Sequence, residues 1–168
     1  MSRLRELFEG LGYEDVATFI ASGNVIFSAA ERDAGALESR TAAHLAESLG
    51  YRVDTFIRTL AHVEGIARSI PFVEDGDDGI TIHVGFLHDE PSPEWKQGFV
   101  AVRSNVDEFR VDGREYYWLC RIRTSDSRIW TSREVKALSL PTSTMRNMSS
   151  IRKLVAKHVV AAGKSNQG

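Results

Sequence analysis

The stretch FRVDGREYYWLCR, residues 109–121, decides the fold of the second half of the chain. Two runs rich in aromatic and β-branched residues flank Asp112-Gly113, and an Asp-Gly pair between such runs is a strong β-hairpin signal. On the N-terminal side of this hairpin, residues 80–87 have the composition of a strand. Ser92-Pro93-Glu94 is typical of a helix start. The second half therefore combines a sheet with helices.

The first half shows the same alternation of helices and strands. Apolar residues at positions 4, 7, 8 and 11 form one helical stripe, which ends before Gly12. The run FIASGNVIF, residues 19–27, predicts a strand with a bulge or tight bend at Gly23. The remaining predicted elements of this half are a helix over 37–49, a strand over 51–58 and a helix over 60–70. We therefore predict an α+β fold with two small layers, each a sheet with helices on one face.

The chain of 168 residues is long enough for two small subdomains. We place their boundary between Ile70 and Ile80. Residues 1–102 hold 8 Lys and Arg against 17 Asp and Glu, whereas 103–168 hold 13 against 6. Either the two halves attract each other, or the basic half presents a face for an anion. The predicted division is an acidic subdomain over 1–75, a basic subdomain over 76–162 and a frayed tail over 163–168.

Several function classes lose their main support. Cys120 is the single cysteine, which excludes an internal disulfide and a thiolate zinc cluster, and its place on an apolar strand face favours an unreactive core thiol. The five histidines lack metal-ligand spacing, and phosphate-loop, dinucleotide and serine-hydrolase motifs are absent. We assign no metal, cofactor or catalytic residue and leave open whether the protein is an enzyme. With no signal-peptide pattern and no apolar run of spanning length, we expect a cytoplasmic protein.

A stretch near the C-terminus is rich in cationic side chains. Its members are Arg121, Arg123, Arg128, Arg133, Lys136, Arg146, Arg152, Lys153 and Lys157. Residues 144–147, TMRN, precede a predicted helix, where backbone N–H groups, a guanidinium and an amide can converge on a carboxylate or phosphate. In the alternative interpretation, Asn147 caps the helix and Arg146 pairs with the acidic half.

Two binding hypotheses follow from these residues. The first is a site for a small anionic molecule between the two halves, formed by Ser22, Asn24, Arg128, Thr144, Arg146 and Asn147. The second is single-stranded nucleic-acid binding on the strand face that carries Tyr117, Arg121 and Arg123. The sequence pI of about 6.2 and the lack of an aromatic RNA-binding consensus speak against nucleic acid as the partner.

Three motifs carry a resemblance to a known family. They are TFIASGNVIF at 18–27, which follows the helix from Leu4-Arg5 to Gly12, then Ser127-Arg128, and TMRN at 144–147 with Lys153-Leu154. They resemble the Y-I-x-S-G-N-V-x-F, S-K and T-x-R-N…K-L motifs of the bacterial family called domain of unknown function 1697. Arg128 stands where members carry lysine. The resemblance implies an α+β fold of two similar ferredoxin-like subdomains, and it implies no activity.

The resemblance also leads to a third function hypothesis. Family members begin with an additional apolar strand and an R-G-I-N-V-G-G-like loop, and Met1 lies in the segment that follows this loop. Either the start is truncated or misassigned, or this member lacks the strand. In the second case we expect the first sheet to have an exposed edge or a gap that a second copy of the chain can fill. In this hypothesis the protein is a structural or interaction module completed by self-association as a homodimer.

Overall fold

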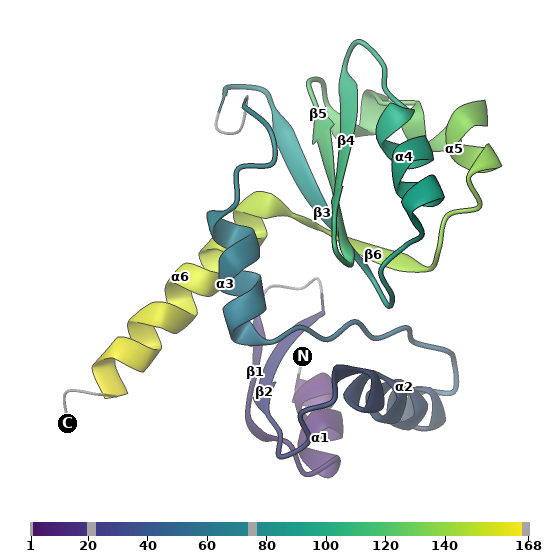
Figure 1. Cartoon of the computed structure of the whole chain (residues 1–168). Coiled ribbons are helices and arrows are strands. Elements are labelled where there is room, and N and C mark those ends of the chain that lie inside the picture. The colour runs from purple at the N-terminus through teal and green to yellow at the C-terminus, as the bar shows by residue number, and fades with distance from the viewer. Residues whose placement is uncertain (1, 20–22, 74–76, 166–168) are drawn as a thin grey trace. The chain divides into compact units, whose positions relative to one another are not determined.

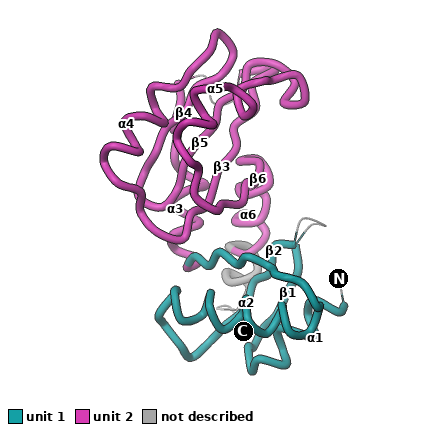
Figure 2. Tube along the Cα trace, turned by 90° about the vertical axis from the view of Figure 1, so that its right-hand side faces the viewer, with its two compact units in different colours: residues 1–58 teal, residues 59–168 magenta. Residues whose placement is uncertain are grey.

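The computed structural model describes residues 2–19, 23–73 and 77–165, with the backbone alone for 159–165. The chain forms two compact units, Met1–Arg58 (unit 1) and Thr59–Gly168 (unit 2), which Figure 2 distinguishes by colour. Each unit combines helices with an antiparallel sheet, which confirms the predicted α+β class. Among the described residues, none of the helices has the length and apolar character needed to cross a membrane.

Unit 1 consists of two helices and a β-hairpin. Its elements are α1 (Ser2–Gly10), β1 (Glu14–Phe19), β2 (Asn24–Ser28) and α2 (Ala34–Leu49). The helices and the hairpin enclose a core of buried side chains: Leu7, Phe8, Tyr13, Val16, Leu37 and Leu45. The Tyr13 ring stacks on Phe27 at 4.4 Å, and its hydroxyl shares a 2.9 Å hydrogen bond with Thr41 of α2. Tyr13 therefore joins the hairpin to α2 through both apolar and polar contacts.

The prediction of one interrupted strand over 19–27 is wrong. The segment contains parts of two antiparallel strands, in which Phe19 of β1 lies opposite Asn24 of β2. Gly23 has a φ of +77°, in the left-handed region that glycine adopts without strain, and it precedes β2 directly. The interruption is therefore a reversal of chain direction beside Gly23, which confirms the alternative of a tight bend and not that of a bulge. Residues 20–22 lie outside the described residues.

The predicted strand over 51–58 also does not form, and the segment runs without regular structure to the next helix (Figure 1). Val53 and Ile57 nevertheless pack against the unit 1 core. A strand needs a hydrogen-bonded neighbour as well as a buried face, and among the described strands none pairs with this segment. Instead, the buried carboxylate of Glu38 accepts the Ile57 N–H at 2.7 Å and lies 3.6 Å from the Arg58 guanidinium.

Unit 2 has the β-α-β-β-α-β order of a ferredoxin-like fold, preceded and followed by a helix. Its helices are α3 (Leu60–Arg68), α4 (Pro93–Ala101), α5 (Arg133–Ala137) and α6 (Met148–Ser165), with short 3₁₀ turns η1 (Thr124–Asp126) and η2 (Ile129–Thr131). Its strands are β3 (Thr81–Leu87), β4 (Asp107–Asp112), β5 (Glu115–Cys120) and β6 (Ser143–Asn147). They form one antiparallel sheet in the order β4-β5-β3-β6. The elements α1-β1-β2-α2 of unit 1 follow the same order as α4-β4-β5-α5.

Side chains cover both faces of the unit 2 sheet. On the face toward α4 and α5, Phe99 of α4 packs against Phe109 of β4 with 4.3 Å between ring centroids. On the other face, the Nε2 of His62 in α3 lies 3.1 Å from the buried carboxylate of Glu115 in β5. Because both faces are covered, every residue of β5 is buried. The turn between β4 and β5 contains Gly113 at a φ of +57°, which confirms the predicted hairpin.

The structure assigns α3 to unit 2, whereas the predicted boundary between Ile70 and Ile80 placed this helix in the first subdomain. α3 packs along α6, as Figure 1 shows. The guanidinium of Arg152 in α6 fastens the end of α3 by donating to the carbonyls of Ala67 at 3.0 Å and Ser69 at 3.1 Å. The helix α6 continues to Ser165, beyond the predicted start of a frayed tail at 163, and residues 166–168 lie outside the described residues.

Gly85 in β3 leaves room for an aromatic ring of the neighbouring strand. A Cβ at this position would lie 1.9 Å from the Cζ atom of Tyr116 in β5. We expect Gly85→Ala to lower the free energy of unfolding by about 1–3 kcal/mol, measured by urea denaturation. The matched control is Gly65→Ala in α3, where an added Cβ meets nothing within 4 Å, and it should be neutral or slightly stabilising. Equal stabilities for the two variants would contradict this packing.

Candidate functional site

A hollow of about 280 Å³ lies in unit 2 where β3 begins, β6 ends and α6 starts. The residues that line it are Asp77, Ile80, Thr81, Ile82, Asn147, Met148, Ser149 and Arg152. Among the predicted site residues that the structure describes, Asn147 alone lines this hollow. The other described members of the predicted site lie elsewhere in the structure.

Asn147 holds the first turn of α6. Its side-chain oxygen accepts hydrogen bonds from the backbone N–H of Ser149 at 2.9 Å and from the Ser149 hydroxyl at 2.8 Å. The alternative role given to Asn147, that of a helix cap, is therefore confirmed. The start of an α-helix concentrates partial positive charge and carries backbone N–H groups without intrahelical partners. The hollow thus lies where the backbone of α6 favours negative charge.

Arg152 brings a full positive charge to the same hollow. Its guanidinium also donates to the carbonyl groups of Ala67 and Ser69. Ser149 and Arg152 are three residues apart in a helix and so share one of its faces. The spacing of Ser149 and Arg152 in a predicted helix is the sequence signal that could have placed both at one site. Asp77 and Thr81 line the same site because β3 lies beside β6.

Arg146 and Asn147 do not converge on one ligand. Residues 143–147 form the edge strand β6 instead of the loop expected before the helix, and Arg146 lies opposite Val84 while Asn147 lies opposite His83. Successive side chains of a strand point to opposite faces of its sheet. The two side chains therefore lie on different faces, which contradicts the predicted convergence of the TMRN motif.

Thr144 and Arg146 share a face of β6 and contact each other. The Arg146 guanidinium donates to the Thr144 hydroxyl at 2.8 Å and to the carbonyl of Met145 at 2.9 Å. Burial lowers the pKa of the Arg146 guanidinium from its ordinary value. Within unit 2, these contacts hold the arginine side chain against its own strand.

Ser127 is half-buried, whereas Arg128 beside it is exposed. The Ser127 hydroxyl donates at 2.9 Å to the carboxylate of Asp107, which is 1% exposed. Arg128 is exposed at the start of η2, and it does not line the hollow. Asn24 begins β2 in unit 1, and Ser22 lies outside the described residues.

The proposed nucleic-acid face lacks its aromatic platform. Tyr117 is 5% exposed, and burial raises the pKa of its hydroxyl. The Arg121 guanidinium forms an ion pair with Glu108 of the neighbouring strand, while Arg123 is exposed. A buried ring cannot stack on a base, so Tyr117, Arg121 and Arg123 do not form the stacking surface that the sequence analysis considered.

Cys120 is fully buried, which confirms its predicted place in the core, and burial raises the pKa of its thiol. Throughout residues 2–19, 23–73 and 77–165, no group of three or more His, Cys, Asp and Glu side chains is arranged to hold a metal ion.

The comparisons with known proteins identify the family. The model described as "Protein of unknown function (DUF1697)" matches residues 1–117. The chain belongs to the DUF1697 family. This match contains the motif at 18–27, whereas the motifs at 127–128 and 144–147 lie beyond it.

Among solved structures, the conserved bacterial protein SP0830 from Streptococcus pneumoniae is similar to this DUF1697 chain. The TM-score is 0.66 at 18% identity, over 92% of this chain and 88% of that chain. At this identity the likeness shows the fold alone, an α+β arrangement of ferredoxin-like subdomains. The comparison with curated proteins finds no match.

His83, opposite Asn147 in the sheet, provides a pH-dependent test of the packing beside the hollow. Its ring stacks on Trp118 at 4.9 Å, and no partner is found among the described residues for its buried Nδ1. Burial lowers the pKa of His83 below its ordinary value of 6.5. The unfolded chain therefore binds a proton more readily, so stability is lost as pH falls below 6.5 toward the folded-state pKa.

We expect an NMR titration to place the midpoint of His83 below 6.5 in the folded protein. Urea unfolding between about pH 7 and about pH 5 should show a weaker pH dependence for His83→Gln than for the wild type. A folded-state midpoint at or above 6.5 would contradict the described burial of this ring.

Proposed function

We propose that this protein is a cytoplasmic binding protein for a small anionic molecule, and that the ligand binds in the hollow at the start of α6. The observation that carries the proposal is the meeting of a helix N-terminus, the Arg152 guanidinium and the hydroxyl-bearing residues Thr81 and Ser149 around about 280 Å³. Backbone N–H groups and a guanidinium are the donors that proteins use for carboxylates and phosphates.

Asp77 narrows the chemistry of the proposed ligand. Its carboxylate lines the same hollow, where it repels a simple anion and accepts hydrogen bonds from hydroxyl or ammonium groups. We therefore propose a ligand with an anionic group at one end and a hydrogen-bond donor at the other. Amino acids, hydroxy acids and small sugar phosphates have this character.

Calorimetric and NMR titrations with serine, glycerol phosphate and inorganic phosphate at low salt test this proposal. We expect serine or glycerol phosphate to shift the amide signals of residues that line the hollow. Thr81→Val and Ser149→Ala should each weaken binding about fivefold, the equivalent of about 1 kcal/mol for one hydrogen bond. Ser125→Ala is the matched control, because this exposed hydroxyl in η1 does not line the hollow.

Asp77→Asn distinguishes the contact of the anionic end of the proposed ligand from that of its hydrogen-bond donor. Removal of the carboxylate should strengthen binding of inorganic phosphate and weaken binding of serine, because repulsion and an ammonium contact are lost together. The proposal fails if none of the three probes shifts signals at the hollow, or if Thr81→Val binds them as the wild type does.

A second candidate function, self-association through unit 1, is favoured by the open edge of β2. Within the described residues, β1 and β2 form a two-stranded sheet, and β2 has no strand on its other side. Val25, Ile26 and Phe27 of β2 are half-buried. A two-stranded sheet is marginal by itself, and an apolar open edge readily pairs with another strand. We propose that the β2 edges of two copies pair antiparallel in a homodimer.

Sedimentation equilibrium over a hundredfold range of protein concentration tests this pairing. We expect a monomer–dimer equilibrium that Ile26→Lys shifts to the monomer, because two lysines would face each other across the joined edges. The control is Ala17→Lys on β1, which lies opposite Ile26 within the hairpin and away from the β2 edge. A monomeric wild-type protein over the whole range would overturn this candidate.

A further inference from the structure

We infer that the groove between α4 and the outer edge of β4 docks an extended, acidic and apolar segment of a partner protein, which adds to the unit 2 sheet as a strand beside β4. This surface is separate from the hollow at α6. Three observations carry the inference: the shape and lining of the groove, the outward-directed backbone groups of β4, and the charges at the two ends of the groove.

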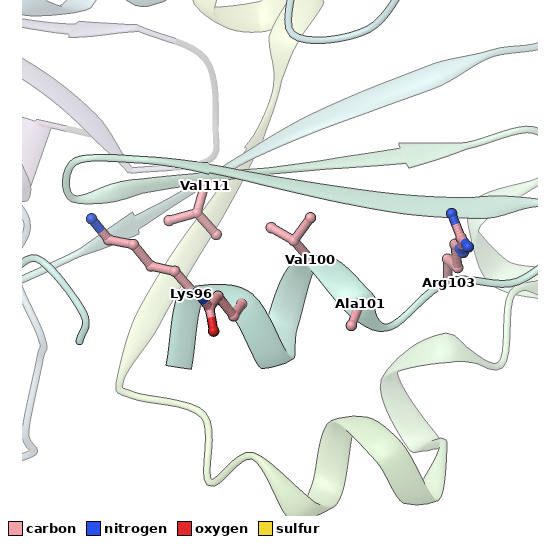
Figure 3. A pocket seen from close by; sticks show the side chains of 6 residues that line it. Lys96, Val100, Ala101, Arg103 and Val111 are labelled. Carbon is pink, nitrogen blue, oxygen red and sulfur yellow. The ribbon is translucent and has the colours of Figure 1, made fainter. Parts of the chain in front are cut away.

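The groove has a volume of about 540 Å³ and an apolar floor. Its lining residues are Lys96, Gln97, Val100, Ala101, Arg103 and Val111. Figure 3 shows Val100 of α4 facing Val111 of β4, with Lys96 and Arg103 toward opposite ends. Val100 is 37% exposed although it lies against an apolar strand residue. The floor therefore presents aliphatic surface that a partner side chain can cover.

β4 is the outermost strand on this side of the sheet. The Arg121 N–H bonds to the Val106 carbonyl, and antiparallel strands alternate between bonded and non-bonded pairs. Residues 107, 109 and 111 therefore direct their backbone groups away from β5. The bond from the Ser104 N–H to the Asp107 carbonyl agrees with this alternation.

Some of these outward backbone groups are already bonded within the chain. Besides the Asp107 carbonyl, the carbonyl of Phe109 accepts from the Arg110 guanidinium at 3.0 Å. By the same alternation, the N–H of Phe109 and both backbone groups of Val111 point outward from the sheet. An added strand pairs with such groups through main-chain hydrogen bonds, which is the usual basis of peptide recognition at a sheet edge.

Charge selects the partner segment. Arg103 is exposed, and no ion pair is found for it in the part of the chain that the structure describes, whereas Lys96 pairs with Glu90. The Arg103 end therefore favours an acidic side chain. Alternate residues of an added strand face α4, so the segment that fits has aliphatic residues over Val100 and Val111 and an acidic residue toward Arg103.

Titration of the full chain with the synthetic peptide Ser-Val-Ser-Val-Ser-Asp-Ser, whose two valines and aspartate share one face of a strand, tests the inference by NMR and calorimetry. We expect shifts confined to α4 and β4, and slower hydrogen exchange of the Val111 amide in the complex. The Arg110 amide, which pairs with β5, serves as the internal reference because it should be protected with and without peptide. The same peptide with lysine in place of the aspartate is the charge-reversed control.

Variants of exposed groove residues distinguish the contribution of charge to peptide binding from that of apolar contact. Arg103→Glu should weaken the aspartate peptide about tenfold and strengthen the lysine peptide, whereas Lys136→Glu, the same charge reversal on an exposed residue of α5, should change neither. Val100→Asp should abolish binding of the aspartate peptide while the far-ultraviolet circular dichroism stays unchanged. The inference is overturned if Arg103→Glu binds both peptides as the wild type does, or if hydrogen exchange of the Val111 amide is unaffected. A parallel titration uses decanoate, an apolar chain with a carboxylate. The inference is also overturned if decanoate occupies the groove and the peptides do not.

Discussion

The pairing of β3 with a neighbour on each side is the constraint on which unit 2 depends. β3 bonds to β5 along one edge and to β6 along the other, so it connects the hairpin to the strand that leads into α6. Among the described residues, unit 1 has no strand in such a central position. Its segment 51–58 packs apolar side chains against the core but forms no strand, and β2 keeps an open edge. Burial alone therefore does not make a strand, because the backbone also needs partners.

A buried carboxylate organises the end of the sheet where β4 begins and β5 ends. Asp107 accepts hydrogen bonds from the indole of Trp118 at 2.8 Å and from the hydroxyls of Ser104 at 2.8 Å and Ser127 at 2.9 Å. A buried carboxylate is costly unless several donors satisfy it, so these contacts fix the position of the segment that follows β5. Ser127, one half of a family motif, thus has a structural role, and Arg128 beside it stays exposed.

The features that the sequence predicts well depend on local signals. The hairpin at Asp112-Gly113 and the start of α4 after Ser92 need only neighbouring residues to be recognised. The predicted convergence of Arg146 and Asn147 is wrong because pairing with β3, more than fifty residues away, turns the motif into a strand. The hollow escaped prediction for the same reason, since it depends on contacts between elements that are distant in the sequence.

Part of the positive charge of the second half has partners within unit 2. Arg110 and Arg121 pair with Glu108, and Arg152 holds the end of α3, so part of the charge is used within unit 2. The groove at β4 and the hollow at β3 and the end of β6 lie on opposite sides of β5, and β5 and β3 are the two inner strands of the sheet. These two strands are bonded on both sides and largely buried, so they resist deformation. Ligands at the two sites would therefore bind the same folded state without competing, and each would add its own stabilisation.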